Sequence, residues 1–150
     1  MVAQQLYEGV AVGKEGSVGL ITYMRTDSVR IADVAADDIR GYIENEFGKE
    51  FRPAHANSYS SKKNAQDAHE AIRPTSVHRT PLEMAKHLNK DQLKLYSLIW
   101  NRAVASQMAS AVFDVTTLLI GAGDYQLRAT GSVLKFEGFL KLSDKKDLLE

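Results

Sequence analysis

The stretch GLITYMRTDS, residues 19–28, marks the point where this 150-residue chain changes from an apolar, extended approach to a helical region. Tyr23 and Arg25 lie two positions apart in it, and in an extended segment residues i and i+2 project from the same face. The planar arginine fork matches two oxygens of a phosphate. The pair therefore predicts attack by a tyrosine on a phosphate ester. A bare Tyr-x-Arg is also typical of a half-buried strand tyrosine beside a solvated arginine.

Helices are predicted on both sides of this stretch. Good helix formers favour a helix over residues 2–12, which Gly13 and Gly16 would end. Ser28 is a candidate N-cap for a helix that runs to Phe47, with Gly48 after it. The residues expected to face the core in that second helix are Ala35, Ile39, Ile43 and Phe47.

The middle of the chain reads as a loop over 52–63 and a short helix over 66–72, because the residue before Pro74 is pushed out of helical geometry. The run TPLE at 80–83 is a capping box that opens a helix ending near Asn89. Asn89 can in turn cap a longer helix over 90–108, in which Trp100 is expected to pack in the core. These two helices resemble a helix-turn-helix arrangement.

Composition changes after residue 110. Residues 113–120 and 125–133 are rich in β-branched and apolar side chains, and GAGD at 121–124 predicts a β-hairpin between them. A lone hairpin is marginally stable. We therefore expect an α+β fold: a mainly helical domain with helix-turn-helix-like packing over 1–110, then a β-strand segment over 111–150 whose hairpin must pack on the helices or belong to a larger sheet.

The overall composition is that of a globular chain, with 44% apolar and 25% charged residues and no cysteine. No apolar run approaches the length of about 20 residues that a membrane span needs. A net charge of zero argues against a broadly basic DNA-binding surface, but the charge is uneven. Residues 27–50 hold seven acids and three bases, a balance of −4, whereas residues 51–79 hold five bases and two acids, a balance of +3.

A second motif lies in the basic stretch: NAQDAHEAIRPT, residues 64–75. Residues 19–28 and 64–75 together resemble two signatures of the type IA DNA topoisomerases, in the family's order and with similar spacing. Met24, between the tyrosine and the arginine, resembles the bacterial topoisomerase I branch. Weaker similarity extends over residues 97–108 and 113–139, and the resemblance implies that the hairpin is part of an incomplete sheet domain.

The resemblance implies an enzyme that relaxes negatively supercoiled DNA by breaking and rejoining one strand through a 5′-phosphotyrosine link, without ATP. It makes Tyr23 the nucleophile, Arg25 the group that stabilises the phosphate, and His69 a phosphate or DNA contact paired with Asp27. Glu70 would hold Arg73 or His69 in place. The further residues expected at the DNA are Thr26, Asp27, Ser28, Lys62, Lys63, Gln66, Glu70 and Arg73.

Type IA enzymes bind Mg²⁺ in an acidic toprim domain, and no Asp-x-Asp-x-Glu cluster occurs in these 150 residues. We expect a fragment that holds no metal and is inactive alone. Its expected partners are single-stranded DNA and the remaining domains of the same polypeptide, in the bacterial cytoplasm at the nucleoid. The alternatives are a non-catalytic helix-turn-helix DNA-binding domain, whose tyrosine is structural, and a protein-interaction domain.

Overall fold

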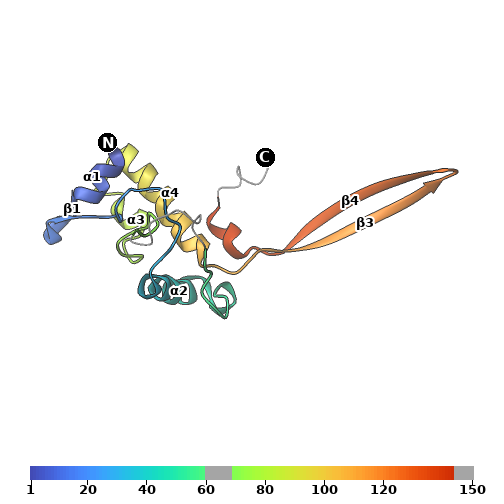
Figure 1. Cartoon of the computed structure of the whole chain (residues 1–150), viewed down its shortest axis with the longest axis horizontal. Helices are drawn as coiled ribbons and strands as arrows, with labels where there is room; N and C mark the ends of the chain where they lie inside the picture. The colour runs from blue at the N-terminus through green and yellow to red at the C-terminus, as the bar shows by residue number, and fades with distance from the viewer. Residues whose placement is uncertain (60–68, 144–150) are drawn as a thin grey trace.

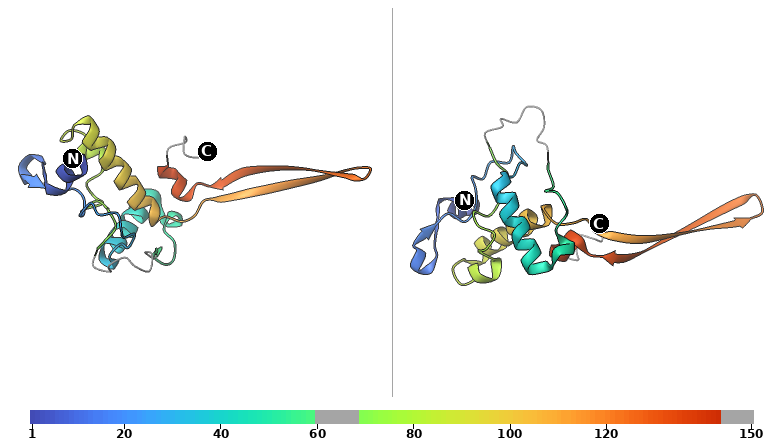
Figure 2. Two further views of the ribbon diagram at one scale, coloured as in Figure 1. Left: turned by 45° about the horizontal axis from the view of Figure 1, so that its top comes forward. Right: turned by 90° about the horizontal axis from the view of Figure 1, so that it is seen from below.

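The computed structural model describes residues 1–59 and 69–143, and a long two-stranded hairpin projects from a helical body in it (Figure 1 and Figure 2). The body contains α1 Val2–Glu8, β1 Val10–Ala11, η1 Gly13–Glu15, β2 Ser17–Val18, α2 Asp33–Phe47, η2 Lys49–Phe51, α3 Pro81–Met84 and α4 Lys90–Ser106. The hairpin consists of β3 Val112–Ala122 and β4 Tyr125–Phe136, and η3 Gly138–Leu142 follows it. Helices with two separate antiparallel sheets confirm the α+β class.

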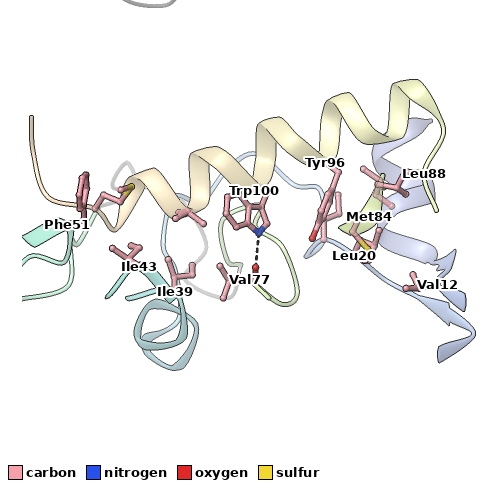
Figure 3. Close-up of a cluster of buried hydrophobic side chains, with 14 residues drawn as sticks. Val12, Leu20, Ile39, Ile43, Phe51, Val77, Met84, Leu88, Tyr96 and Trp100 are labelled. Atoms are coloured by element: carbon pink, nitrogen blue, oxygen red, sulfur yellow. Dashed lines mark hydrogen bonds between the residues drawn. The ribbon is translucent and has the colours of Figure 1, made fainter. Parts of the chain in front are cut away.

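The helix α4 forms the spine of the body. Asn89 caps its N-terminus, as predicted, and the structure shows a full capping box there: the Asn89 side chain accepts from the backbone N–H of Gln92, whose side chain accepts from the N–H of Asn89. Tyr96 and Trp100 point from one face of α4 into the core (Figure 3). The Trp100 indole N–H donates to the carbonyl of Val77 at 2.9 Å, which confirms its role as a packing residue.

The helix α2 ends at Phe47 before Gly48, as predicted, but it begins four residues later than expected. Ser28 is not its N-cap: the Ser28 hydroxyl accepts from the backbone N–H of Arg30, and Ala32 stands at the N-cap position. Residues 28–32 stay out of the helix because their backbone groups form hydrogen bonds with a distant segment of the chain. The carbonyl of Arg30 accepts from the N–H of Ala71, and the N–H of Ala32 donates to the Glu70 carboxylate.

The first helix is also shorter than predicted. It ends at Glu8, because Gly9 adopts φ 132°, and the chain then turns into the small β1–β2 hairpin. The sequence pattern missed this hairpin, whose strands have only two residues each. Its turn is closed by a hydrogen bond from the N–H of Val12 to the carbonyl of Gly16.

Two further helix predictions are wrong. In the predicted helix over 66–72, residues 69–72 have no helical structure, and the other positions lie outside the described residues. Ala71 donates its N–H to Arg30 and gives its carbonyl to the Thr22 hydroxyl, so long-range bonds occupy its backbone. The helix opened by the TPLE box has its predicted cap at Thr80, but it ends at Met84 rather than near Asn89.

The β3–β4 hairpin is confirmed, with Gly123 at φ 63° in its turn. Side chains on both of its faces are exposed along most of its length. At its base the Phe136 ring packs on the Phe51 ring with centroids 4.8 Å apart, and the N–H of Phe139 donates to the carbonyl of Ala109. The division into domains at residue 110 stays a prediction. No helix of the described residues is long and apolar enough to cross a membrane.

Candidate active site

The two sequence motifs meet because their backbones pair. The N–H of Thr22 donates to the carbonyl of Arg73 at 2.9 Å, and the N–H of Thr75 donates to the carbonyl of Leu20 at 3.0 Å. Ile21 and Pro74 form an antiparallel bridge between these two bonds. The extended approach to the tyrosine thus gains a partner strand about 50 residues further along the chain. Sequence periodicity carries no signal for a pairing this short and this distant.

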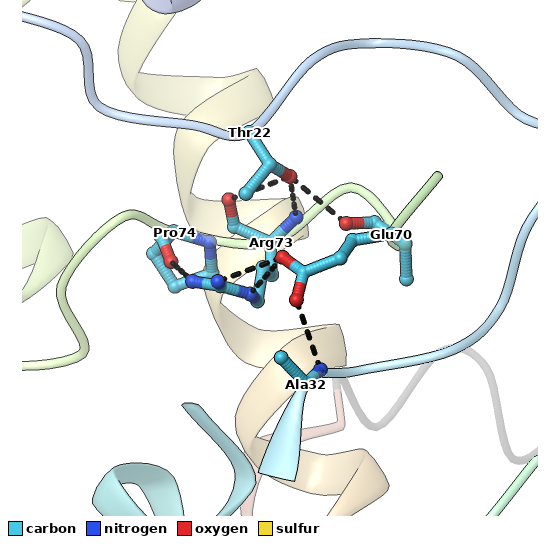
Figure 4. Close-up of polar contacts among 6 residues, drawn as sticks. Thr22, Ala32, Glu70, Arg73 and Pro74 are labelled. Atoms are coloured by element: carbon cyan, nitrogen blue, oxygen red, sulfur yellow. Dashed lines mark hydrogen bonds and ion pairs between the residues drawn. The ribbon is translucent and has the colours of Figure 1, made fainter. Parts of the chain in front are cut away.

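The Thr22 hydroxyl adds two further hydrogen bonds between the two paired segments. It donates to the carbonyl of Ala71 at 2.8 Å and accepts from the N–H of Arg73 at 3.0 Å (Figure 4). Thr22 was not among the predicted site residues. A threonine directly before the tyrosine is the only sequence signal for it, and a β-branched residue there reads equally well as an ordinary strand residue.

Glu70 and Arg73 form a brace beneath the site. The Arg73 Nε and Nη2 atoms lie 3.2 and 2.8 Å from Glu70 Oε2, and Nη1 donates to the carbonyl of Pro74 (Figure 4). The other Glu70 oxygen accepts from the N–H of Ala32 at 3.0 Å. Glu70 therefore holds Arg73, one of the two predicted options. All three guanidinium nitrogens of Arg73 bond within the protein, and its contact with DNA stays a prediction.

Tyr23 stands at the surface between two other rings. Its side chain is 55% exposed. The ring meets the Tyr7 ring edge-on with centroids 5.4 Å apart, and the His69 ring with centroids 6.3 Å apart. An open pocket of about 310 Å³ lies here, lined by Thr22, Tyr23, His69 and Glu70. The predicted nucleophile thus faces solvent beside residues of the second motif.

The Arg25 side chain contacts both His69, which lies beside Tyr23, and Asp27. Arg25 Nη1 lies 3.3 Å from His69 Nε2, and Arg25 Nε lies 2.7 Å from Asp27 Oδ2. Because an arginine can only donate, Nε2 is the acceptor in this contact. The expected His69–Asp27 pair is wrong: Asp27 bonds Arg25, two residues away, and its Oδ1 is buried with no hydrogen-bond partner among residues 1–59 and 69–143.

The remaining predicted residues divide into three groups. Thr26 is exposed next to Arg25, whereas Ser28 is buried and its hydroxyl bonds the backbone, so a phosphate contact by Ser28 stays a prediction. His69, Glu70 and Arg73 were expected on one helical face; they converge on the site without a helix. The residues outside the described parts of the chain are Lys62, Lys63 and Gln66.

A metal centre is a separate question. Among residues 1–59 and 69–143, no group of three or more histidine, cysteine, aspartate or glutamate side chains is placed so that it could hold a metal ion. Asp27 and Glu70 are both engaged with arginines. The chemistry that these described residues offer is therefore that of a tyrosine hydroxyl, a guanidinium and an imidazole.

This chain is similar to a known family and to a solved structure. A family model described as DNA topoisomerase matches residues 1–150. The full-length topoisomerase I from Thermotoga maritima, in a monoclinic crystal form, matches with a TM-score of 0.79 and 43% sequence identity. The match covers 95% of this chain but only 22% of the Thermotoga maritima chain.

Proposed function

Because this chain belongs to the type IA DNA topoisomerases, in the bacterial topoisomerase I branch, we propose that Tyr23 is the nucleophile that cuts one DNA strand. The activity is the breaking and rejoining of that strand, which relaxes negatively supercoiled DNA. The chain spans 22% of the Thermotoga maritima relative, so the activity belongs to a longer polypeptide in which this segment supplies the tyrosine.

One observation carries the proposal: Tyr23 and Arg25, both in the first motif, each contact His69 of the second motif. Tyr23 contacts the His69 ring, and Arg25 Nη1 lies 3.3 Å from the same imidazole. A phosphate that binds Arg25 therefore comes close to the Tyr23 hydroxyl. A structural strand tyrosine would need neither the exposure of Tyr23 nor an arginine bound to the same imidazole.

The chemistry is a phosphoryl transfer. The Tyr23 Oη atom attacks the phosphorus, a new P–Oη bond forms, and the bond from phosphorus to the 3′ oxygen breaks. The phenol proton is lost, the 3′ oxygen leaves as a hydroxyl, and the 5′ end stays attached to the tyrosine. One phosphodiester is exchanged for another, so the reverse attack by the 3′ hydroxyl reseals the strand without ATP.

Arg25 supplies the positive charge at the reacting phosphate. Its Nε atom is held by Asp27, which orients the planar guanidinium while about half of the side chain remains exposed. Within the described residues, Nη2 of Arg25 makes no hydrogen bond, and Nη1 contacts only the imidazole. The outer edge of the guanidinium can therefore donate to two phosphate oxygens, whose charge grows in the transition state. His69 becomes a second donor when its Nε2 atom, which accepts from Arg25 in the structure, takes up a proton and binds the phosphate instead.

Mg²⁺ and most of the DNA-binding surface belong to other parts of the polypeptide in this proposal. The described residues do not fit a metal, so no step here is assigned to one. We place Mg²⁺ in a toprim domain of the full-length protein and expect this segment alone to be inactive. The partner is single-stranded DNA in the bacterial cytoplasm, with Thr26, Lys62 and Lys63 as further contacts whose binding weakens as salt rises.

The test is covalent capture by the full-length topoisomerase that carries this segment. A labelled single-stranded oligonucleotide is mixed with the protein and Mg²⁺, the reaction is denatured, and protein-linked DNA is counted. We expect Tyr23→Phe to abolish the adduct, whereas Tyr125→Phe, which changes an exposed tyrosine in the hairpin, leaves it unchanged. An adduct that survives Tyr23→Phe would refute the proposal. DNA binding without any adduct would instead favour the non-catalytic DNA-binding domain.

A further inference from the structure

The ring of Tyr7 is the nearest aromatic neighbour of Tyr23, and it comes from an element outside both motifs. Tyr7 lies in the last turn of α1, its ring 5.4 Å from the Tyr23 ring at an interplanar angle of 65°. The His69 ring makes a similar edge contact. The Tyr23 hydroxyl makes no hydrogen bond to any of the described residues. The position of its ring is therefore set by these two contacts.

The packing of α1 against the motif strand holds Tyr7 in place. The N–H of Leu20 donates to the carbonyl of Leu6 at 2.7 Å, and both of these side chains are fully buried. Gly19, which precedes Leu20, and Tyr7, which follows Leu6, complete the contact. A Cβ atom on Gly19 would lie 2.6 Å from the Tyr7 carbonyl oxygen, so only glycine lets the strand approach the end of α1 this closely.

We propose that Tyr7 is a positioning residue for Tyr23, an inference that rests on the proposed function of Tyr23 as nucleophile. The Tyr7 and His69 edges restrict the rotamers of the exposed Tyr23 ring and keep its hydroxyl turned to the open side of the pocket. An exposed tyrosine without such contacts would visit several rotamers, only one of which points at the phosphate held by Arg25. In-line attack requires the correct rotamer at the moment of reaction.

The exposure of Tyr7 separates this role from a structural one. Its side chain is 42% exposed, whereas the adjacent Leu6 is fully buried and anchors α1 in the core. Removing the Tyr7 ring should therefore change the freedom of Tyr23 more than the stability of the fold. The role belongs to the ring edge, which phenylalanine retains, and not to the Tyr7 hydroxyl.

The experiment measures single-turnover adduct formation by the full-length topoisomerase at a saturating concentration of a single-stranded oligonucleotide. The variants are Tyr7→Ala, Tyr7→Leu, Tyr7→Phe, Tyr23→Phe and, as an exposed control, Tyr125→Ala. We expect Tyr7→Ala and Tyr7→Leu to slow adduct formation about 10-fold. Tyr7→Phe and Tyr125→Ala should stay within about twofold of wild type. The Kd for DNA and the Tm should be unchanged in all of them.

Each result decides one question. Unchanged adduct formation in Tyr7→Leu, or an equal loss in Tyr7→Phe, overturns the positioning role. A loss in Tyr7→Ala that is fully explained by a weaker Kd or a lower Tm, and is absent in Tyr7→Leu, also overturns it. The proposed function fails separately, through an adduct that persists in Tyr23→Phe. Slow adduct formation by Tyr7→Leu, together with no adduct from Tyr23→Phe, supports both the positioning role and the proposed function.

Discussion

Tyr96 and Tyr23 have the same side chain but opposite surroundings, one buried and the other exposed. Tyr96 is fully buried on α4, and its hydroxyl donates to the carbonyl of Arg79 at 2.6 Å. Tyr23 is half exposed on the motif strand, and its hydroxyl bonds none of the described residues. The first tyrosine holds the core together and has no access to a substrate. The second faces solvent and is not part of the buried core, so the core and the candidate site lie in different regions.

The brace between Glu70 and Arg73 lies at the border of these two regions. It connects the backbone at Ala32 to the second motif, and its carboxylate and guanidinium are each less than a quarter exposed. Substitutions in the core, in the brace and at the site should therefore lower the free energy of unfolding by progressively smaller amounts.

The largest loss is expected from Trp100→Ala. Trp100 is 4% exposed and donates its indole N–H to Val77, so the substitution leaves a large cavity and an unpaired carbonyl. We expect a loss of about 4 kcal/mol in the free energy of unfolding, measured by urea titration with far-UV circular dichroism. A loss below about 1.5 kcal/mol would show that α4 is not the spine of the body.

Breaking the brace with Glu70→Ala should cost about 2 kcal/mol, because Arg73 and the N–H of Ala32 both lose their acceptor while partly buried. Glu44→Ala is the matched control. It removes an exposed ion pair to Arg52 and should cost less than about 1 kcal/mol. Equal losses in the two variants, by the same urea titration, would contradict the assignment of Glu70 as a brace.

Tyr96→Phe should cost about 1 kcal/mol at neutral pH for its lost hydrogen bond. The substitution should also change how the free energy of unfolding depends on pH under alkaline conditions. Burial raises the pKa of Tyr96, so the fold holds the phenol neutral while the unfolded chain ionises it above about pH 10. Stability in wild type should fall as the pH rises past that point. Unfolding titrations at pH 8 and pH 11 should show a smaller fall in Tyr96→Phe, and an equal fall in both proteins would refute this.

The smallest effect on stability is expected at the proposed nucleophile itself. Tyr23→Phe keeps the ring contacts with Tyr7 and His69 and removes a hydroxyl that faces solvent. The free energy of unfolding should change by less than about 0.5 kcal/mol. The same variant should lose covalent capture of DNA completely. A large stability change would mean that Tyr23 is structural, and the contrast with Tyr96 would fail.

Several elements were predictable because their signals are local. The caps at Thr80 and Asn89 each involve residues three positions apart, and the β3–β4 turn is signalled by glycine between two β-rich runs. Two of the predicted helices that were wrong in extent, those over 28–47 and 66–72, contain segments whose backbone groups bond distant residues. Residues 28–32 and 69–72 bond each other, and this keeps both segments out of a helix.

The candidate site was predictable in its residue types but not in its contacts. Tyr23, Arg25 and His69 were identified from the motifs, and the structure brings them together. The partners were not foreseen: Asp27 bonds Arg25 instead of His69, and Tyr7 lies outside both motifs. Side-chain partners across a site depend on the relative placement of segments, on which local sequence carries no information.

The sequence by itself determined the family, the candidate reactive side chains, the spine helix and the hairpin, because motifs, caps and turns are properties of neighbouring residues. Only the tertiary structure decided that the strand before Tyr23 pairs with residues 73–75, that Gly19 lets α1 pack closely on that strand, and that Tyr7 and His69 flank the proposed nucleophile. These contacts join segments far apart along the chain. They form because burying Leu6, Leu20 and Ile21 in one core brings those segments to the same place.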